Sequence, residues 1–249
     1  MRVSGERVST DAGGFRPTWQ RHVAAYAAAA ELLPPGRVLD LGCGVGHSFE
    51  LLRPRETVGV DLSADALAGQ RRATVVADMR ALPFPARSFD SVLSVQSIEH
   101  VPDPERVVSE ARRVLVPGGT AVFVTPNRLT FGPPDEIVDP YHYVEFDAGA
   151  LRRLCAVEFA EVELRGLFGS ERYRAIVARE RARLDALLRR DPLRLRRLVP
   201  RRGRQLAYDG MLRRARRVAD ADAQAIDVSD FELRAGPLAD ALDLVAICR

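Results

Sequence analysis

The chain has 249 residues, of which 47% are hydrophobic, so it can bury the core of one large α/β domain that also carries an insertion. No apolar run approaches the roughly 18 residues of a membrane-spanning helix, and the polar start lacks the apolar stretch of a secretory signal, which predicts a cytoplasmic protein. All 37 basic residues are arginine, and 20 of them lie between positions 152 and 217 against eight acidic residues, so that segment is basic and the remainder acidic. The cysteines Cys43, Cys155 and Cys248 are too widely spaced for a disulfide framework or a CxxC metal site, and we expect no bound metal.

Helices and strands alternate through the first half of the chain. The helices we expect are 18–33, 46–52, one capped by Ser63, and 104–115. The strands we expect are 37–41, 57–61, 74–77, 89–95 and 120–125. Because apolar strands are joined by helices, the pattern predicts a parallel sheet that is covered on both faces.

The second half is less regular and begins with a proline-rich loop over residues 132–143. After it we expect a helix over 147–155, a strand over 160–164, a helical segment over 170–218, an extended stretch over 227–233 and a closing strand over 241–248. The helical segment coincides with the basic region. Its apolar residues recur at spacings of three and four, which predicts packing on the domain, and they are Ile176, Leu184, Leu187, Leu188, Leu195 and Leu198.

The strongest chemical signal is a glycine turn in which a buried strand ends in Asp40 and three glycines, Gly42, Gly44 and Gly46, lead toward a helix. Glycines allow sharp turns and close approach of a ligand, and free N–H groups at a helix start bind anionic groups. A dinucleotide fingerprint would need a glycine where His47 stands, and a P-loop would need a lysine, which the chain lacks. The pattern therefore favours a nucleotide-type ligand that presents a carboxylate and an ammonium group.

Acidic residues follow the next two predicted strands. Asp61 lies 21 residues after Asp40, where a carboxylate can accept hydrogen bonds from ribose hydroxyl groups. Asp78 follows the third strand and can accept a hydrogen bond from an adenine amino group, while Met79 can lie against the ring. Each acid alone is also explained as a helix cap, but the glycine turn upstream favours the ligand role.

These motifs resemble those of class I S-adenosylmethionine-dependent methyltransferases, of the small-molecule type called methyltransferase type 11. The matching stretches are VLDLGCGVG, VGVDLS, VVADMRALPFPARSFDSVLSVQSIEHVPDPERVVSEARRVLVPGG and AVFVTPN, which cover roughly residues 37–127. The resemblance implies one domain over residues 1–249 with a Rossmann-like, doubly wound, seven-stranded sheet whose last strand is antiparallel. It also implies S-adenosylmethionine as cofactor, a covering helix over 18–35, a cofactor-binding core over 37–127, and a helical insertion, or lid, over 170–225.

The resemblance implies roles for residues as well. The glycine turn would cradle the methionine moiety, the acid after the second strand would hold the ribose, and the Asp-Met pair after the third would hold the adenine. Gln96 would lie near the sulfonium and the acceptor. The implied cofactor residues are Asp40, Gly42, Cys43, Gly44, Gly46, Asp61, Leu62, Asp78, Met79 and Gln96.

Methyl transfer needs mainly the alignment of acceptor, methyl and sulfur, because the sulfonium is already activated. An oxygen or nitrogen acceptor can also need a base, for which histidine is the usual choice. His142, in the proline-rich loop after the fifth strand, is the catalytic base we expect, and Gln96 is the other catalytic candidate. His22 lies on the covering helix, and His47 and His100 read as structural residues.

The predicted activity is methyl transfer to an oxygen or nitrogen of a small molecule such as a natural product, a sugar or a lipid-linked metabolite. One alternative is a protein that binds the cofactor without transferring methyl. A nucleic-acid methyltransferase is a weaker alternative, because no base-reading motif is present. The basic segment would bind an acidic or lipid-linked substrate, rest on an anionic membrane, or form a solvated face. We expect it to act as a lid, with no specific nucleic-acid partner.

Overall fold

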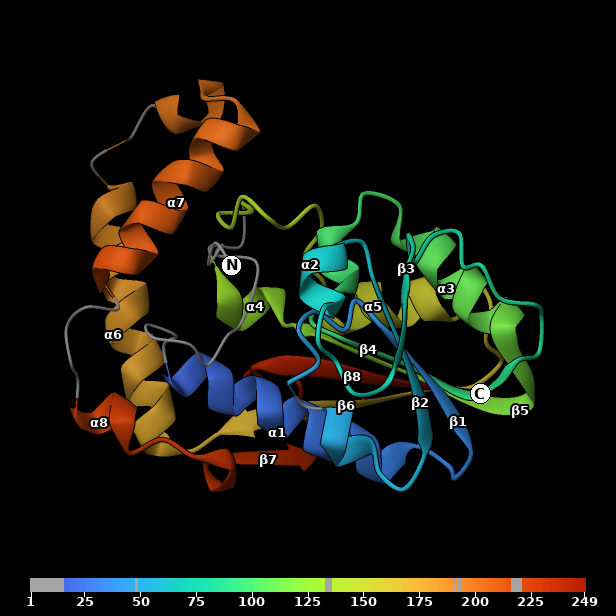
Figure 1. Cartoon of the computed structure of the whole chain (residues 1–249). Coiled ribbons are helices and arrows are strands. Elements are labelled where there is room, and N and C mark those ends of the chain that lie inside the picture. The colour runs from blue at the N-terminus through green and yellow to red at the C-terminus, as the bar shows by residue number, and fades with distance from the viewer. Residues whose placement is uncertain (1–15, 48, 133–135, 190, 192–193, 216–220) are drawn as a thin grey trace.

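The computed structural model describes residues 16–47, 49–132, 136–189, 191, 194–215 and 221–249. They are organised around one eight-stranded sheet in the order β3-β2-β1-β4-β5-β8-β6-β7 (Figure 1). The strands are β1 (Arg37–Leu41), β2 (Glu56–Asp61), β3 (Ala73–Val76), β4 (Phe89–Val95), β5 (Leu115–Pro126), β6 (Val162–Gly169), β7 (Phe231–Arg234) and β8 (Asp243–Cys248).

Helices cover both faces of this sheet. They are α1 (Arg16–Leu32), η1 (Phe49–Leu52), α2 (Ala64–Leu67), η2 (Ile98–His100), α3 (Pro104–Val114), α4 (Arg128–Phe131), α5 (Ala148–Cys155), α6 (Glu171–Leu188), η3 (Leu195–Leu198), α7 (Arg201–Ala215), α8 (Ala221–Gln224) and η4 (Val228–Asp230). On one face α1 buries Tyr26 and Ala29 against Val95 and Val122. On the other face α3 and α5 form the larger core with β1, β4 and β5. Each fully buried aliphatic side chain stabilises this arrangement by about 1.5–3 kcal/mol.

The direction of the strands confirms the predicted fold class. Strands β1 to β5 pair in parallel, whereas β8 is antiparallel to both β5 and β6. The sheet has eight strands, one more than the seven that we expected. Residues 231–234 form β7, which pairs antiparallel with β6 at the edge of the sheet through the partners Phe231 and Gly169.

Local sequence explains most of the element boundaries. The Ser63 side chain accepts a hydrogen bond from the Ala66 N–H and caps α2, and Asp147 caps α5 in the same way. The helix predicted over 46–52 is only the 3-10 turn η1, and it cannot start at Gly46, because the φ of +68° at that residue is incompatible with a right-handed helix. Strand β5 begins earlier than predicted, since Leu115 already pairs with Phe89 of β4.

The segment predicted as a helical insertion forms an arm of α6, η3, α7 and α8 that projects from the sheet (Figure 1). We call residues 171–224 the helical arm. Its root is buried, because Tyr173 and Ile176 of α6 pack against Ala223, Ile226 and Leu242.

The expectation that the arm's leucines all pack on the domain is wrong for two of them. Leu195 is 57% exposed and Leu198 is 81% exposed, because η3 lies beyond the packed root of the arm. The predicted packing of Leu184, Leu187 and Leu188 falls on side chains outside the described part of the structure. None of the helices that the structure describes is long and apolar enough to cross a membrane.

Two of the cysteines that are remote in sequence meet in the core. Cys155 on α5 and Cys248 on β8 are fully buried free thiols that interact with each other. That contact and burial raise the pKa of Cys248 far above its usual range. Wide spacing in sequence therefore did not keep these thiols apart, although neither belongs to a disulfide.

Candidate active site

The glycine turn lies at the carboxyl ends of the parallel strands, beyond β1. Gly42, Gly44 and Gly46 have φ values of +66°, +53° and +68°, in the left-handed region that residues with a Cβ rarely adopt. A Cβ at Gly42 would lie 2.4 Å from Cβ of Ser97 and 3.1 Å from Cε of Met79, so this glycine is needed for close packing. A Cβ at Gly44 would meet no atom within 4 Å, so the turn presents an open backbone surface at that residue.

Asp61, at the end of β2, is tied directly to the glycine turn. Its Oδ2 accepts a hydrogen bond from the N–H of Gly44 at 2.9 Å, and its Oδ1 accepts one from the N–H of Ser63 at 2.8 Å. The adjacent Leu62 side chain is 66% exposed. The structure thus fixes the Asp61 carboxylate beside the open surface of the turn.

Asp78 and Met79, after β3, point to different neighbours. The Asp78 carboxylate forms a two-pronged pair with the guanidinium of Arg80, with contacts of 3.0 and 2.8 Å. Hydrogen bonds from that guanidinium lower the pKa of Asp78. Met79 instead reaches back to Gly42. The sequence did not indicate that Arg80 engages this carboxylate.

Asp40 lies beneath the turn rather than on its surface. It is 1% exposed, and its two oxygens contact the hydroxyl of Tyr26 at 3.0 Å and the guanidinium of Arg72 at 2.8 Å. Cys43 is buried next to it, and burial raises the pKa of its thiol to about 12, so this sulfur is unreactive. Tyr26 and Arg72 were missed by sequence reasoning, because neither belongs to a local motif.

Gln96 connects three elements at the end of β4. Its φ of +48° is unusual for a residue with a side chain, and its N–H donates to the Val124 carbonyl at 2.7 Å. Its side chain accepts from His22 of α1 at 3.2 Å and donates to Asp243 of β8 at 3.0 Å. Burial lowers the pKa of His22 to about 4, so this ring is the neutral donor to Gln96 at physiological pH.

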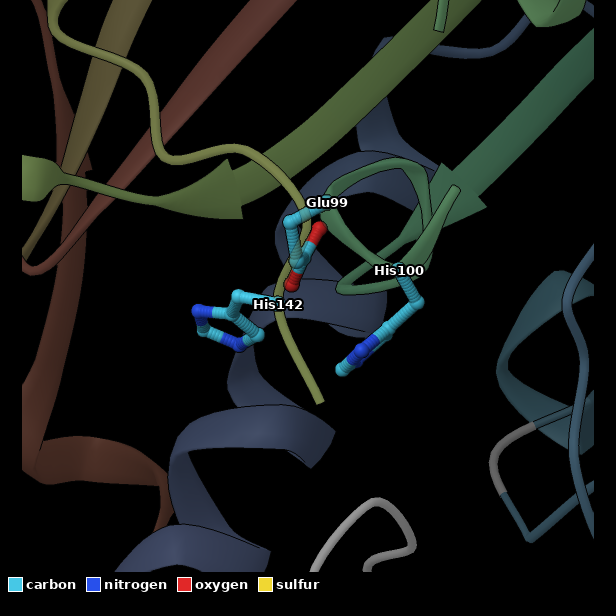
Figure 2. A group of neighbouring side chains, drawn as sticks. All are labelled: Glu99, His100 and His142. Carbon is cyan, nitrogen blue, oxygen red and sulfur yellow. The ribbon is translucent and has the colours of Figure 1, made fainter. Parts of the chain in front are cut away.

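The predicted base, His142, lies in a buried polar cluster with Glu99 and His100 (Figure 2). Its Nδ1 donates to Oε1 of Glu145 at 3.2 Å, and its ring centroid lies 5.1 Å from that of His100. Burial opposes protonation of His142, but the hydrogen bond to Glu145 and the nearby carboxylates outweigh burial and raise its pKa. Sequence reasoning missed Glu99 and Glu145, although Glu145 stands only three residues after His142.

The helical arm holds the loop that carries this cluster. Arg201 of α7 donates to the carbonyl oxygens of Pro140 and Tyr141 at 2.8 and 2.9 Å, and the Tyr208 hydroxyl donates to Asp139 at 3.0 Å. The Arg201 guanidinium also lies 3.5 Å above the ring of Tyr143. The position of His142 therefore depends on α7.

Comparison with known proteins identifies the class to which this fold and site belong. Residues 39–123 match the family model described as a methyltransferase domain. A probable S-adenosylmethionine-dependent methyltransferase of Mycobacterium tuberculosis is 31% identical over 99% of this chain and 89% of its own length. The chain belongs to the S-adenosylmethionine-dependent methyltransferases, and it is an enzyme that uses S-adenosylmethionine.

Shorter matches and a solved structure extend this finding. The phosphatidylethanolamine N-methyltransferase of Cereibacter sphaeroides is 38% identical over 46% of this chain and 60% of its own. The demethylmenaquinone methyltransferase of Renibacterium salmoninarum is 34% identical over 46% of this chain and 50% of its own. The crystal structure of an S-adenosylmethionine-dependent methyltransferase from Thermotoga maritima shares the fold, with a TM-score of 0.60, 18% identity, and coverage of 92% of this chain and 89% of that one.

Proposed function

We propose that the enzyme transfers the methyl group of S-adenosylmethionine to an oxygen or nitrogen of a lipid-linked small molecule at an anionic membrane surface. The observation that carries this proposal is the surface of the helical arm. Leu195, Leu198 and Leu206 are 57%, 81% and 70% exposed, whereas most of the large aliphatic residues that the structure describes are buried. Exposed aliphatic side chains beside basic ones are typical of surfaces that dip into a membrane interface.

The charges of the arm support the same partner. Arg183, Arg189 and Arg202 are exposed on α6, on the turn after it and on α7. Other arginines of the arm stabilise its structure, since Arg196 pairs with Asp191 and Arg201 donates hydrogen bonds to loop carbonyl groups. Exposed guanidinium groups attract anionic lipid headgroups by about 1 kcal/mol each near a membrane surface. The names of the two shorter relatives, for phosphatidylethanolamine and demethylmenaquinone, agree with a lipid-type acceptor.

For the cofactor we propose the roles that the motifs indicate. The open backbone at Gly44 would take the methionine moiety, Asp61 the ribose diol, and Met79 the adenine ring beside Asp78. Asp40 would act from below by holding the turn through Tyr26 and Arg72. Gln96 would face the reacting sulfur from the end of β4, where its hydrogen bonds to His22 and Asp243 restrict its orientation.

For the acceptor side we propose that α1 covers the cofactor and that the helical arm shapes the pocket as a lid. The lid role is supported by the bonds from α7 to the loop around His142. Catalysis would come mainly from alignment of the acceptor with the methyl group, since effective molarities in well-oriented reactions are large. His142 is the residue of this loop that could hold the acceptor's proton.

Binding to vesicles and transfer to lipids test this proposal together. We expect the protein to sediment with phosphatidylglycerol vesicles at low salt and less with phosphatidylcholine vesicles, because salt and neutral headgroups remove the electrostatic attraction. Leu198→Ser should weaken binding to phosphatidylglycerol by about 1–2 kcal/mol, roughly 5–30-fold. The matched control is Val157→Ser, which changes an aliphatic residue that is 74% exposed outside the arm.

Incubation with methyl-deuterated cofactor and a lipid extract should then yield deuterium in a lipid product, detected by mass spectrometry. Equal binding to both kinds of vesicle, or equal effects of the two serine variants, would contradict the membrane part of the proposal. Deuterium found only in water-soluble compounds would contradict the lipid-linked acceptor.

A further inference from the structure

We propose that Glu99, His100 and His142 form a binding site for one divalent transition-metal ion of the Zn²⁺ type. Each residue offers one ligand atom, and the three atoms lie within 4.8 Å of one another. Figure 2 shows the Glu99 carboxylate between the two imidazole rings. The sequence predicted no metal, because Glu99 and His100 come from η2 and His142 from a distant loop.

The spacing of the ligand atoms is close to that of a metal centre. Three atoms no more than 4.8 Å apart share a central point that lies within about 2.8 Å of each of them, and zinc bonds to nitrogen and oxygen measure about 2.0–2.2 Å. Shifts of about 0.6–0.8 Å per ligand atom would therefore close the site. Small rotations of the side chains supply such shifts, so the backbone can stay as it is.

Glu99 provides the independent observation that points to a cation. It is 1% exposed, and its Oε2 accepts a hydrogen bond from Thr125 at 3.0 Å. Its Oε1 is buried with no hydrogen-bond partner among the described residues. In the part of the chain that the structure describes, no arginine pairs with either acid of this cluster, and the ion pair that Glu145 forms is with His142. A buried carboxylate oxygen without a partner is costly, and coordination of a cation would satisfy it.

Both histidines are oriented as metal ligands commonly are. Nδ1 of His142 is bonded to the Glu145 carboxylate, and Nδ1 of His100 lies 3.2 Å from the carbonyl oxygen of Tyr141. A histidine that donates through Nδ1 to a carboxylate or carbonyl presents Nε2 to the metal in the usual carboxylate–histidine–metal arrangement. The ligating atom would thus be Nε2 in both rings.

The donor set indicates which ions fit. Two imidazoles and one carboxylate suit Zn²⁺ and the other first-row divalent ions, whereas Mg²⁺ and Ca²⁺ prefer oxygen ligands alone. Three protein ligands also leave a coordination position open. An oxygen of the acceptor in the proposed function could take that position, and His142 would then bind the metal instead of holding the acceptor's proton. The metal site itself does not depend on the identity of the acceptor.

A competing explanation is a protonated His142 held by Glu99, Glu145 and Asp139 without any metal. Titration of the chelator-treated full-length protein with Co²⁺ and then Zn²⁺ separates the two explanations. We expect one Co²⁺ per chain with visible bands of a site with nitrogen and oxygen ligands, no thiolate charge-transfer band, and displacement of Co²⁺ by Zn²⁺. Absence of the thiolate band would exclude the three cysteines as ligands.

Variants locate the site. Glu99→Gln and His142→Ala should each lower Zn²⁺ affinity at least a hundredfold, and Glu145→Gln should lower it about 10–100-fold because it orients His142. The control His47→Gln changes a histidine outside the cluster and should leave affinity unchanged. Circular dichroism would establish that each variant is folded.

Two results would overturn the proposal. One is failure of the folded wild-type protein to retain Co²⁺ or Zn²⁺ at micromolar concentration, which would favour the protonated His142. The other is a Zn²⁺ affinity that is the same in wild type and in folded His142→Ala. Neither measurement uses an acceptor or the methyl-transfer reaction, so failure of the proposed function would leave the metal result unaffected.

Discussion

The glycine-turn side of the sheet and the helical arm use charged residues in different ways. Around the turn, single acids at strand ends are held by one or two specific donors, as Asp61 is held by the N–H groups of Gly44 and Ser63. On the arm, many arginines lie along helices, and several of them remain exposed. The first pattern suits a small ligand held in one geometry, and the second suits a partner that is large and loosely ordered. Under the proposed roles of these two regions, changes in the turn should affect cofactor binding and changes in the arm should affect the acceptor.

The largest effect on cofactor binding is expected from a substitution in the glycine turn itself. Gly44→Val should abolish measurable cofactor binding, because Gly44 has a φ of +53° and faces open space where a ligand would lie. Gly118→Val is the matched control, since Gly118 has a φ of +78° and also meets nothing within 4 Å. Both variants should lose about 1–2 kcal/mol of stability, but only the first should lose binding in calorimetric titration. If folded Gly44→Val bound the cofactor with wild-type affinity, the glycine turn would not be the cofactor-binding loop.

Removing the outer part of the arm should have the opposite effect: cofactor binding should persist, and methyl transfer should be lost. Replacing residues 182–218 by a short glycine-serine linker spares the buried root around Tyr173 and Ile176. We expect cofactor affinity to stay within about twofold and methyl transfer to fall below detection, because the loop that carries His142 loses Arg201 and Tyr208. Transfer at the wild-type rate would show that the arm is not the lid.

A milder effect is expected at the ribose position. Asp61→Ala should weaken cofactor binding by about 1–2 kcal/mol, roughly 5–30-fold, since a charged acceptor of hydrogen bonds is lost. The control is Asp65→Ala, which removes an exposed acid from nearby α2. Calorimetry would measure both. An unchanged affinity in folded Asp61→Ala would remove this residue from the site.

A further prediction concerns stability at acid pH rather than binding. The pKa of His22 is lowered by burial to about 4, from a usual value near 6.5. Between these values the unfolded chain binds a proton that the folded chain does not, so this residue makes the free energy of unfolding fall as the pH falls from about 6.5 to about 4. The effect is on the order of 3 kcal/mol at most.

Urea unfolding of wild type and His22→Gln over this range would measure the difference between their pH slopes. His22 faces Gln96, Asp243 and Arg21, and the variant leaves these three residues in place. At pH 8 His22 is neutral in both states, so the slopes should agree there. Equal slopes between pH 4 and 6.5 would show that His22 does not stay neutral in the folded state.

The sequence predicted those parts of the fold that local patterns determine. Strand β4 has the predicted bounds, and α3 starts at the predicted Pro104 because proline suits the first turn of a helix. The edge strand β7 was only suggested as an extended stretch, since its four residues carry little pattern and form a strand by pairing with β6. Exposure of Leu198 was not predicted, because helical spacing shows a face but not what covers it.

In the candidate site too, residues that belong to local motifs were predicted, whereas their contacts with distant residues were not. The positions of the glycine turn, Asp61 and Met79 followed from motifs, because each lies at the end of a strand whose place in the sheet was predictable. Their partners did not follow, as Arg72 under Asp40 and Glu145 beside His142 show. Those contacts arise from loops whose conformation depends on the rest of the fold.

The order of strands has a consequence for synthesis on the ribosome. Strand β8 lies between β5 and β6 in the sheet but follows both of them in the chain. Until β8 has left the exit tunnel, the outer edge of β5 has no strand to pair with, and β6 and β7 can form at most a detached hairpin-like pair. A nascent chain at this stage exposes unpaired edges that favour association with other chains. Slow translation between β7 and β8 should therefore lower the yield of folded protein more than an equal pause before β6.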